Sequence, residues 1–397
     1  MNLSSKTFCP APFVHMYIHK NEDIKICCVT TENKLASAST ELDLEKRWKS
    51  NYYKKIRQQF LDGEEPDFCS KCFAIEKHNG RSDRMNFNDR YPFLKPNVET
   101  GNQYGSPIDL DIRPGNLCNL KCRMCGPHSS SQLEKETLQH SDLFKGFHSK
   151  IYNTEGVFSE KNLNFLLKNV DKGSRQIKFL GGEPTIMPEV SDILDKLIAT
   201  DNTNVRIHIT TNCTNTTEQF MNKLKQFRHL SFNYSVDGTN KVVEYIRHPV
   251  KFDIIEKNIR LYKNIAEDDN IIFVFQAYNF FNLYDTIKWA ADIGIRVRTE
   301  LLESPDWCSI LHIPKEIRDK ELYKTKELML NEEYSEWITD PNNIILPTID
   351  RILVDDRELD TWEFAKVTKF FDKIRKQHIK DYIPEIWEII KEEYESI

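Results

Sequence analysis

The stretch LCNLKCRMCG, residues 117–126, carries three cysteines within eight positions: Cys118, Cys122 and Cys125. It follows a strand-like run of apolar residues at positions 108–112. Cysteine thiolates hold [4Fe-4S] clusters, and such a cluster takes four of them when every iron has a protein ligand. A loop with three cysteines therefore predicts a cluster with one iron open for another ligand. This loop is the candidate centre of the chemistry.

Length, charge and cysteine content limit the class of protein. The chain of 397 residues exceeds one ordinary domain, and no apolar run approaches the roughly 18 residues of a membrane span. The N-terminal sequence MNLSSKTFCPAPF lacks a basic region followed by an apolar segment. We therefore expect a cytoplasmic protein without a membrane partner, whose ten cysteines bind metal rather than form disulfides. The formal charge of -6 does not indicate nucleic acid.

Strand-length apolar runs alternate with helical patterns through the middle of the chain. The expected strands are residues 108–112, 176–180, 205–211, 230–236, 271–278 and 296–302. Strands separated by helices predict an α/β fold with a parallel sheet, either open or closed partway into a barrel. Residues 305–397 are expected to form a helical C-terminal extension, with a helix over 362–379 and another after Pro384.

A second set of cysteines lies in the N-terminal region. Two apolar runs around a polar turn at residues 19–23 predict a hairpin, and a helical pattern follows over residues 41–60. A polar segment that follows this region predicts a linker. The cysteines flank the hairpin and the helix and could converge: Cys9, Cys27 or Cys28, Cys69 and Cys72.

The residues alone leave two questions about this second set open. If Ile24 and Ile26 face the small core, strand alternation slightly favours Cys28 over Cys27 as the second cysteine. Four cysteines of this kind suit either a closed [4Fe-4S] cluster or a tetrahedral zinc ion.

Four motifs follow successive expected strands. In parallel α/β sheets, functional loops lie at the carboxyl ends of the strands, so we expect all four motifs on one rim. The motifs are the cysteine loop, then Gly181-Gly182-Glu183-Pro184, then Thr210-Thr211-Asn212, then Ser235-Val236-Asp237-Gly238.

These motifs, CxxxCxxC, GGEP, TTN and SVDG with Arg247 downstream, resemble the radical S-adenosylmethionine (SAM) superfamily over residues 107–302. The resemblance implies a partial (β/α)6 TIM-type barrel in which the cysteine loop binds a [4Fe-4S] cluster whose open iron chelates SAM. Met124 departs from the pattern, because family members usually carry an aromatic residue there. The implied SAM ligands are Gly181, Gly182 and Glu183 beside the amino group, Ser235 and Arg247 at the carboxylate, and Asn212 near the ribose.

The N-terminal region resembles the twitch and SPASM-type auxiliary cluster domains of the same superfamily, although those often follow the barrel. This resemblance favours Cys27 over Cys28 and implies a second [4Fe-4S] cluster. The implied ligands are Cys9, Cys27, Cys69 and Cys72. The expected organisation is a small α+β auxiliary cluster domain (1–85), a linker (86–106), the barrel (107–304) and the helical extension (305–397).

The resemblance implies an oxidoreductase-type enzyme that reductively cleaves SAM to a 5′-deoxyadenosyl radical and abstracts hydrogen from a substrate. We expect the oxidative modification of a peptide or protein, with a one-electron reductant such as a flavodoxin or ferredoxin as partner. One alternative is the dehydrogenation of a sugar-like or other small-molecule alcohol. Another is a cluster- or zinc-binding protein without catalysis on the same fold. No motif names the substrate.

Overall fold

The computed structural model describes residues 6–19, 24–30, 43–77, 80–141, 159–170, 175–302, 304–331 and 345–397. The chain divides into two compact units. The first comprises Met1–Leu117, Lys150–Ile209 and Thr217–Ser231, and the second comprises Cys118–Ser149, Thr210–Thr216 and Phe232–Ile397. Within the described ranges, no helix has the length and apolar character needed to span a membrane.

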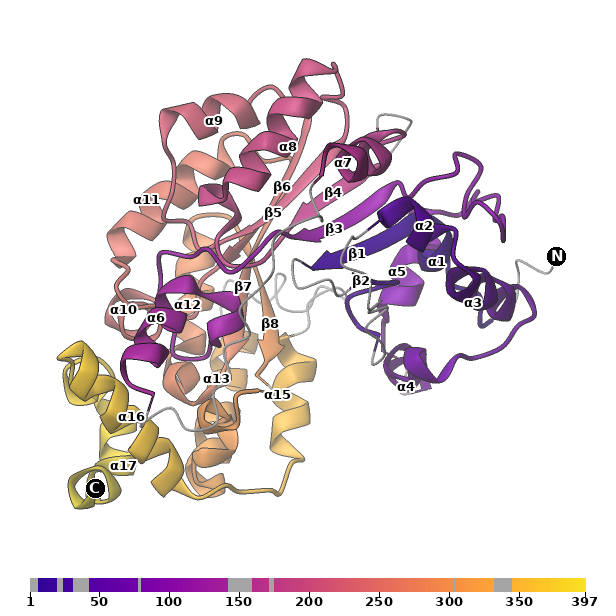
Figure 1. The fold of residues 1–397 in the computed structure, drawn as a ribbon. Coiled ribbons are helices and arrows are strands. Elements are labelled where there is room, and N and C mark those ends of the chain that lie inside the picture. Colours follow the sequence, from indigo (N-terminus) through magenta and orange to yellow (C-terminus); the bar gives the residue numbers. More distant parts are fainter. Residues whose placement is uncertain are drawn as a thin grey trace. The chain divides into compact units, whose positions relative to one another are not determined.

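The first unit is built on a mostly parallel sheet (Figure 1). Its strands, in spatial order, are β2 (Ile24–Lys25), β1 (His15–His19), β3 (Asp109–Arg113), β4 (Gln176–Phe179) and β5 (Arg206–Thr211). Only the β1–β2 pair is antiparallel among these neighbours. The predicted N-terminal hairpin is therefore confirmed in its two strands, while most of its predicted turn lies outside the described residues.

The parallel pairing of β1 with β3 is a feature that the sequence did not predict. Four of the five residues of β1 are buried, and a hairpin standing alone cannot bury both of its faces. In the sheet, β1 lies between β2 and β3 and pairs with both. His15 pairs in register with Asp109, and its Nδ1 lies 3.1 Å from Oδ1 of that residue. The predicted N-terminal domain and the first strands of the predicted barrel thus lie in one unit.

The helices of the first unit partly follow the sequence pattern. They are α1 (Ala11–Val14), α2 (Leu44–Trp48), α3 (Asn51–Leu61), α4 (Ser70–Lys77), α5 (Asp83–Arg90), α7 (Glu160–Leu167), α8 (Pro188–Ala199) and α9 (Glu218–Leu224). The single helix expected over 41–60 is broken, because the Ser50 side chain accepts a hydrogen bond from the Tyr53 amide and starts α3 anew. Residues 41–42 lie outside the described ranges.

The segment 86–106, expected as a linker, is part of this unit. It contains the end of α5, and its later residues lie against α2 and α3. Trp48 Nε1 donates to the carbonyl of Thr100 at 2.7 Å, and Arg57 Nε and Nη1 donate to the carbonyls of Pro12 and Val98. These contacts hold part of the segment against α2 and α3.

The second unit continues the α/β pattern with β7 (Asp268–Phe275) parallel to β8 (Arg296–Leu301), while β6 (His229–Ser235), like β5, has residues in both units. Its helices are α6 (Ser131–Gln139), α10 (Asn240–Ile246), α11 (Phe252–Lys263), α12 (Leu283–Asp292), α13 (Lys315–Asn331), α15 (Ile345–Leu353), α16 (Thr361–Arg375) and α17 (Pro384–Ser396). All six predicted strands are present, and the α/β class with a parallel sheet and a helical C-terminal region is confirmed.

The C-terminal helices α16 and α17 pack side by side (Figure 1). The helix expected over 362–379 ends at Arg375, because Lys376 adopts a left-handed conformation with φ of 53°. Pro384 begins α17, where its fixed φ suits the first helical position.

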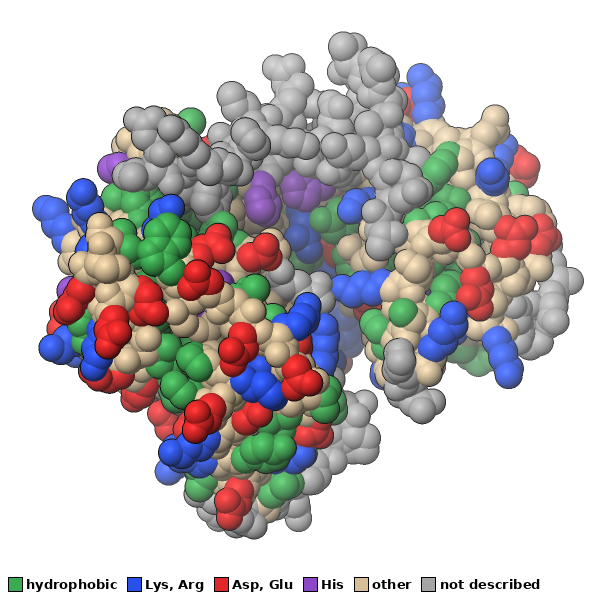
Figure 2. All heavy atoms as spheres, turned by 90° about the horizontal axis from the view of Figure 1, so that it is seen from below, with side chains coloured by type: hydrophobic (Ala, Val, Ile, Leu, Met, Phe, Trp, Pro, Cys, Tyr) green, Lys and Arg blue, Asp and Glu red, His purple; other side chains and the backbone are tan. Residues whose placement is uncertain are grey.

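Charged side chains are mixed on the face drawn in Figure 2, where acidic and basic groups are interspersed over much of the described surface. This mixture agrees with the small formal charge of the chain, which carries 61 acidic and 55 basic residues.

Candidate functional site

The cysteine loop begins directly after the first unit ends and is held by its backbone within the second unit. Cys118 and Cys122 are buried, and Cys125 is half-buried. The amide of Lys121 donates to the carbonyl of His248 at 2.7 Å, and the Cys125 amide donates to the Cys122 carbonyl at 3.1 Å. The loop is therefore ordered by neighbouring backbone as well as by its own turn.

Arg247 lies beside the loop and places a positive charge next to its thiols. Its Nη1 is 4.0 Å from the Cys122 sulfur, and its Nε donates to Asp237 Oδ2 at 2.7 Å. A hydrogen bond from Cys125 lowers the pKa of the Cys122 thiol against the opposing effect of burial, and Arg247 lowers it further. A lowered pKa favours the thiolate, which is the form that binds metal.

Asp237 is a site residue that the sequence analysis named only as part of a motif. It is fully buried, and its Oδ1 accepts a hydrogen bond from the Val274 amide at 2.8 Å. Burial raises the pKa of Asp237, and the facing Arg247 opposes that effect. A buried arginine needs an anionic partner, so the aspartate of SVDG, close to Arg247 in the sequence, was the available signal.

Asn212 lies next to the first cysteine of the loop. Its Nδ2 is 3.9 Å from the Cys118 sulfur and donates to Asn119 Oδ1 at 3.0 Å. Its Oδ1 accepts hydrogen bonds from the amide and hydroxyl of Thr214. The turn continues through Cys213, whose φ of 61° is left-handed. Ser235 ends β6 within the same unit and is half-buried.

The GGEP motif belongs to the first unit and packs on residues 115–117, which lead into Cys118. The Gly182 amide donates to the Gly115 carbonyl at 3.0 Å, and the Glu183 amide donates to the Leu117 carbonyl at 2.8 Å. A Cβ atom on Gly182 would overlap the Leu117 carbonyl, so this close approach requires glycine. The carboxylate of Glu183 is buried and caps the next turn by accepting from Thr185.

The four predicted N-terminal cysteines line one cavity in the first unit. Cys9, Cys27, Cys69 and Cys72 contribute to its wall together with apolar side chains and Arg84. Cys28 is exposed and does not line this cavity. The observed convergence joins residues from three separate stretches of the sequence.

The thiols around this cavity are electrostatically linked. Burial, followed by the charge of Cys72, raises the pKa of Cys69 to about 12, and Arg84 opposes the shift. Burial also raises the pKa of Cys9, with smaller contributions from Cys69 and Cys72. A bound cation reverses this preference and makes the thiolates stable. Among the described residues, no three Cys, His, Asp or Glu side chains group as ligands of a single metal ion.

A separate cavity of about 410 Å³ lies at the carboxyl end of β8 in the second unit. Its wall is largely apolar, with arginine and aspartate side chains also present. The lining includes Leu302, Ile310, Leu311, Ile352, Leu359, Arg351, Arg357, Asp306 and Asp355. The adjacent Cys308 is buried and its Sγ donates to the Arg123 carbonyl of the cysteine loop at 3.7 Å. The cavity wall and the cysteine loop are thus in contact through one short segment.

Comparison with known proteins identifies the class of this α/β site. A family model described as the radical SAM superfamily matches residues 112–290. The matched residues include the cysteine loop, GGEP, TTN, SVDG and Arg247, so this segment is similar to the radical SAM superfamily. Members of this superfamily are enzymes that use SAM and a [4Fe-4S] cluster. A search of curated proteins gives no match.

Three solved structures are among those that the structural comparison finds. The native anSMEcpe with bound AdoMet is 21% identical with a TM-score of 0.43, and the match covers 56% of this chain and 60% of that one. Streptococcus suis SuiB bound to the precursor peptide SuiA is 15% identical with a TM-score of 0.37, covering 85% and 70%. Kitasatospora setae TsrM, a radical SAM methyltransferase with cobalamin and a [4Fe-4S] cluster, is 11% identical with a TM-score of 0.35, covering 50% and 37%. The chain thus spans less than two thirds of anSMEcpe.

Proposed function

We propose that this chain is a radical SAM enzyme that binds a [4Fe-4S] cluster through Cys118, Cys122 and Cys125 and binds SAM at the remaining iron. The observation that carries the proposal is the buried Arg247 beside a three-cysteine loop, within a segment that matches the superfamily. The donor set fits the group, because three thiolates leave one iron open.

The residues around the loop have distinct proposed roles toward SAM. Arg247 provides a charge-assisted partner for the SAM carboxylate, and Asp237 fixes the orientation of its guanidinium. Ser235 adds a hydroxyl for the carboxylate, and Asn212 lies near the ribose. Gly181, Gly182 and Glu183 border the amino group. The two glycines have no side chain, so their backbone carbonyls can approach an ammonium closely.

We assign a second [4Fe-4S] cluster to Cys9, Cys27, Cys69 and Cys72. Their common cavity supports the assignment, and the exposure of Cys28 supports Cys27 as the second ligand. When bound, the first cluster supplies the electron that cleaves SAM and starts hydrogen abstraction, and the second provides an outlet for the electron that the oxidised substrate releases. An external one-electron reductant is required for the first step.

The proposed substrate is a peptide or protein that undergoes oxidative modification. The cavity at the end of β8 supports a subsite for an apolar side chain, because its wall is largely apolar and the Arg357 charge there is already paired with Asp355. The dye anilinonaphthalene sulfonate binds to apolar surfaces through its aromatic rings and is a suitable probe. We expect Leu311→Trp, which fills the cavity, to weaken dye binding by about tenfold. Val354→Trp, an exposed position outside the lining, is the control and should bind as the unmodified chain does.

Anaerobic reconstitution tests the enzyme assignment. We expect about eight irons and eight sulfides per chain for two [4Fe-4S] clusters, and 5′-deoxyadenosine when SAM and dithionite are added. Zinc in place of iron at the N-terminal site would give about four irons and one zinc. An iron-loaded chain that forms no 5′-deoxyadenosine would contradict the catalytic assignment.

A further inference from the structure

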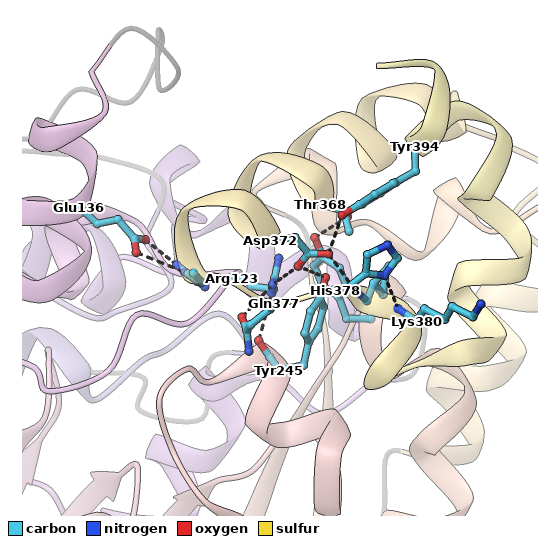
Figure 3. Close-up of polar contacts among 12 residues, drawn as sticks. Arg123, Glu136, Tyr245, Thr368, Asp372, Gln377, His378, Lys380 and Tyr394 are labelled. Atoms are coloured by element: carbon cyan, nitrogen blue, oxygen red, sulfur yellow. Dashed lines mark hydrogen bonds and ion pairs between the residues drawn. The ribbon is translucent and has the colours of Figure 1, made fainter.

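Arg123 lies between two of the proposed cluster ligands and is completely buried. Its Nη2 is 2.8 Å from Asp372 Oδ1 on α16, and its Nε donates to the Tyr245 carbonyl at 3.0 Å (Figure 3). The same Nη2 reaches Gln377 Oε1 at 3.2 Å, and the guanidinium carbon lies 3.6 Å from the centre of the Tyr245 ring. Backbone and side chain fix this residue together, because the Arg123 amide donates to the Ile246 carbonyl at 2.9 Å.

Asp372 is in turn held by elements outside the cysteine loop. Its Oδ1 also accepts a hydrogen bond from the Tyr245 hydroxyl at 2.7 Å. Its Oδ2 accepts from the Tyr394 hydroxyl of α17 at 3.1 Å and from the Ile379 amide at 2.8 Å. Figure 3 shows these groups converging on the carboxylate. The position of the carboxylate is therefore set by α10, the segment after α16, and α17.

A second polar contact joins α16 to the helix that follows the loop. Arg375 Nη2 lies 2.7 Å from Glu136 Oε2 on α6, and its Nε donates to Glu136 Oε1 at 3.3 Å. Lys121, inside the cysteine loop, donates to Glu136 Oε1 at 2.8 Å. Through Asp372 and Arg375, α16 therefore contacts both the cysteine loop and α6, the helix that follows the loop.

Apolar packing covers the third cysteine of the loop from the same side. Leu133 of α6 and Phe371 of α16 form a buried pair, and Cys125 packs against it. The partly buried Val367 and Ile374 of α16 pack on the same pair. One face of α16 therefore forms a wall beside Cys125.

The charge of the Arg123–Asp372 pair is poorly explained by stability alone. Burying an ion pair costs desolvation free energy, and a well-packed apolar pair often stabilises a protein as much or more. A fixed ion pair does give a geometric constraint. Here that constraint acts on the residue that follows Cys122 and lies two positions before Cys125.

We propose that Asp372 is a positioning residue for the cysteine loop. By fixing Arg123, it sets the relative placement of Cys122 and Cys125, and α16 is a structural part of the cluster site. This inference rests on the proposed function, because it assumes a cluster bound by Cys118, Cys122 and Cys125.

The test compares Asp372→Asn with Tyr394→Phe in the reconstituted full-length chain. The asparagine keeps the shape but removes the charge that faces Arg123, while the phenylalanine removes a different hydrogen bond from the same carboxylate. Two quantities are measured: the rate of iron release to a chelator, and the electron paramagnetic resonance spectrum of the reduced protein with and without SAM. SAM perturbs only the cluster with an open iron, so the spectrum reports on this site.

We expect Asp372→Asn to release iron from this cluster at least about tenfold faster and to alter its SAM-dependent spectrum, as losses of outer-shell partners do. Tyr394→Phe should release iron more slowly than Asp372→Asn, because it leaves the charge of Asp372 and its contact with Arg123 in place. The same release rate and spectrum in Asp372→Asn would overturn the inference, and so would equal effects of the two variants on melting temperature alone.

Arg123→Lys decides the question if Asp372→Asn does not fold, because it keeps the charge and loses the planar guanidinium contacts. A release rate and spectrum unchanged in this variant would also overturn the inference. An unmodified chain that takes up no cluster would instead contradict the proposed function.

Discussion

The two cysteine sites of this chain are built in opposite ways. The loop of Cys118, Cys122 and Cys125 holds its thiols within eight residues, and buried charged groups of the second unit, Arg123 and Arg247, surround it. The N-terminal site gathers Cys9, Cys27, Cys69 and Cys72 from three distant stretches around one cavity of the first unit.

This difference teaches what each site depends on. In the cysteine loop, the short spacing along the chain already brings the three thiols close together. Residues from distant parts of the chain then affect only the exact position of these thiols and the charge around them. A site assembled from separate elements depends on the packing of those elements. In the first unit, that packing includes β1, which lies between Cys9 and Cys27 in the sequence and is tied to β3 by His15 and Asp109.

The largest expected effect comes from removing the short-spaced ligands. Cys118→Ala combined with Cys122→Ala and Cys125→Ala should abolish 5′-deoxyadenosine formation and remove about four irons per chain, because the proposed SAM-binding cluster loses all of its protein ligands. The remaining iron should stay at the N-terminal site. Iron analysis and product quantification check both results. Retained 5′-deoxyadenosine formation would contradict the comparison.

The second prediction separates two adjacent cysteines at the assembled site. Cys27→Ala should lower the iron content by up to about four per chain, because Cys27 lines the common cavity. Cys28→Ala is the matched control and should leave iron unchanged, since Cys28 is exposed. Iron and sulfide analysis after reconstitution distinguishes them, and the reverse result would move the ligand to Cys28.

A smaller effect is expected when a charged neighbour of the loop is changed. Arg247→Lys should weaken SAM binding by about 10- to 100-fold, because lysine keeps the charge but loses the planar fork that meets both Asp237 and a carboxylate. Equilibrium binding of SAM to the reconstituted chain measures this loss. Lys251→Arg exchanges the same two side-chain types at an exposed position and is the matched control, and equal losses in both variants would contradict the role of Arg247.

The smallest effect concerns the pH dependence of the first unit. Burial lowers the pKa of His15, but the hydrogen bond to Asp109 and the negative charges of Asp109 and Asp111 together outweigh it and raise the pKa overall. Burial raises the pKa of Asp109, but the contacts with His15 and Arg90 outweigh it and lower the pKa overall. The stability from His15 is present below about pH 6.5 and lost as pH rises through its raised folded-state pKa. The stability from Asp109 is present above about pH 3.9 and lost as pH falls below that value.

Thermal unfolding between pH 5 and pH 9, on the order of the range where histidine titrates, checks this prediction. The melting temperature should fall with rising pH by about 2–4 °C for each kcal/mol lost. His15→Asn should flatten this dependence. An identical slope in the variant would assign the pH dependence to other groups.

The sequence predicted the parts of the fold that repeat locally. The six strands follow from short apolar runs between helical patterns, and the cysteine loop follows from spacing. The break between α2 and α3 escaped prediction, because the Ser50 cap competes with a pattern of apolar residues that runs through it. The pairing of β1 with β3 also escaped, because nothing local in either strand specifies a partner so far away in the chain.

The sequence by itself predicted the chemistry proposed for the cysteine loop, because its three thiols are neighbours along the chain and the motifs that accompany it occur in order. Only the tertiary structure decided which residues surround that loop. The charge of Arg247 is balanced by Asp237, and Arg123 is held by Asp372, a residue 249 positions further along the chain. A charged side chain that is removed from water requires a partner, and the fold determines which residue lies close enough to provide it.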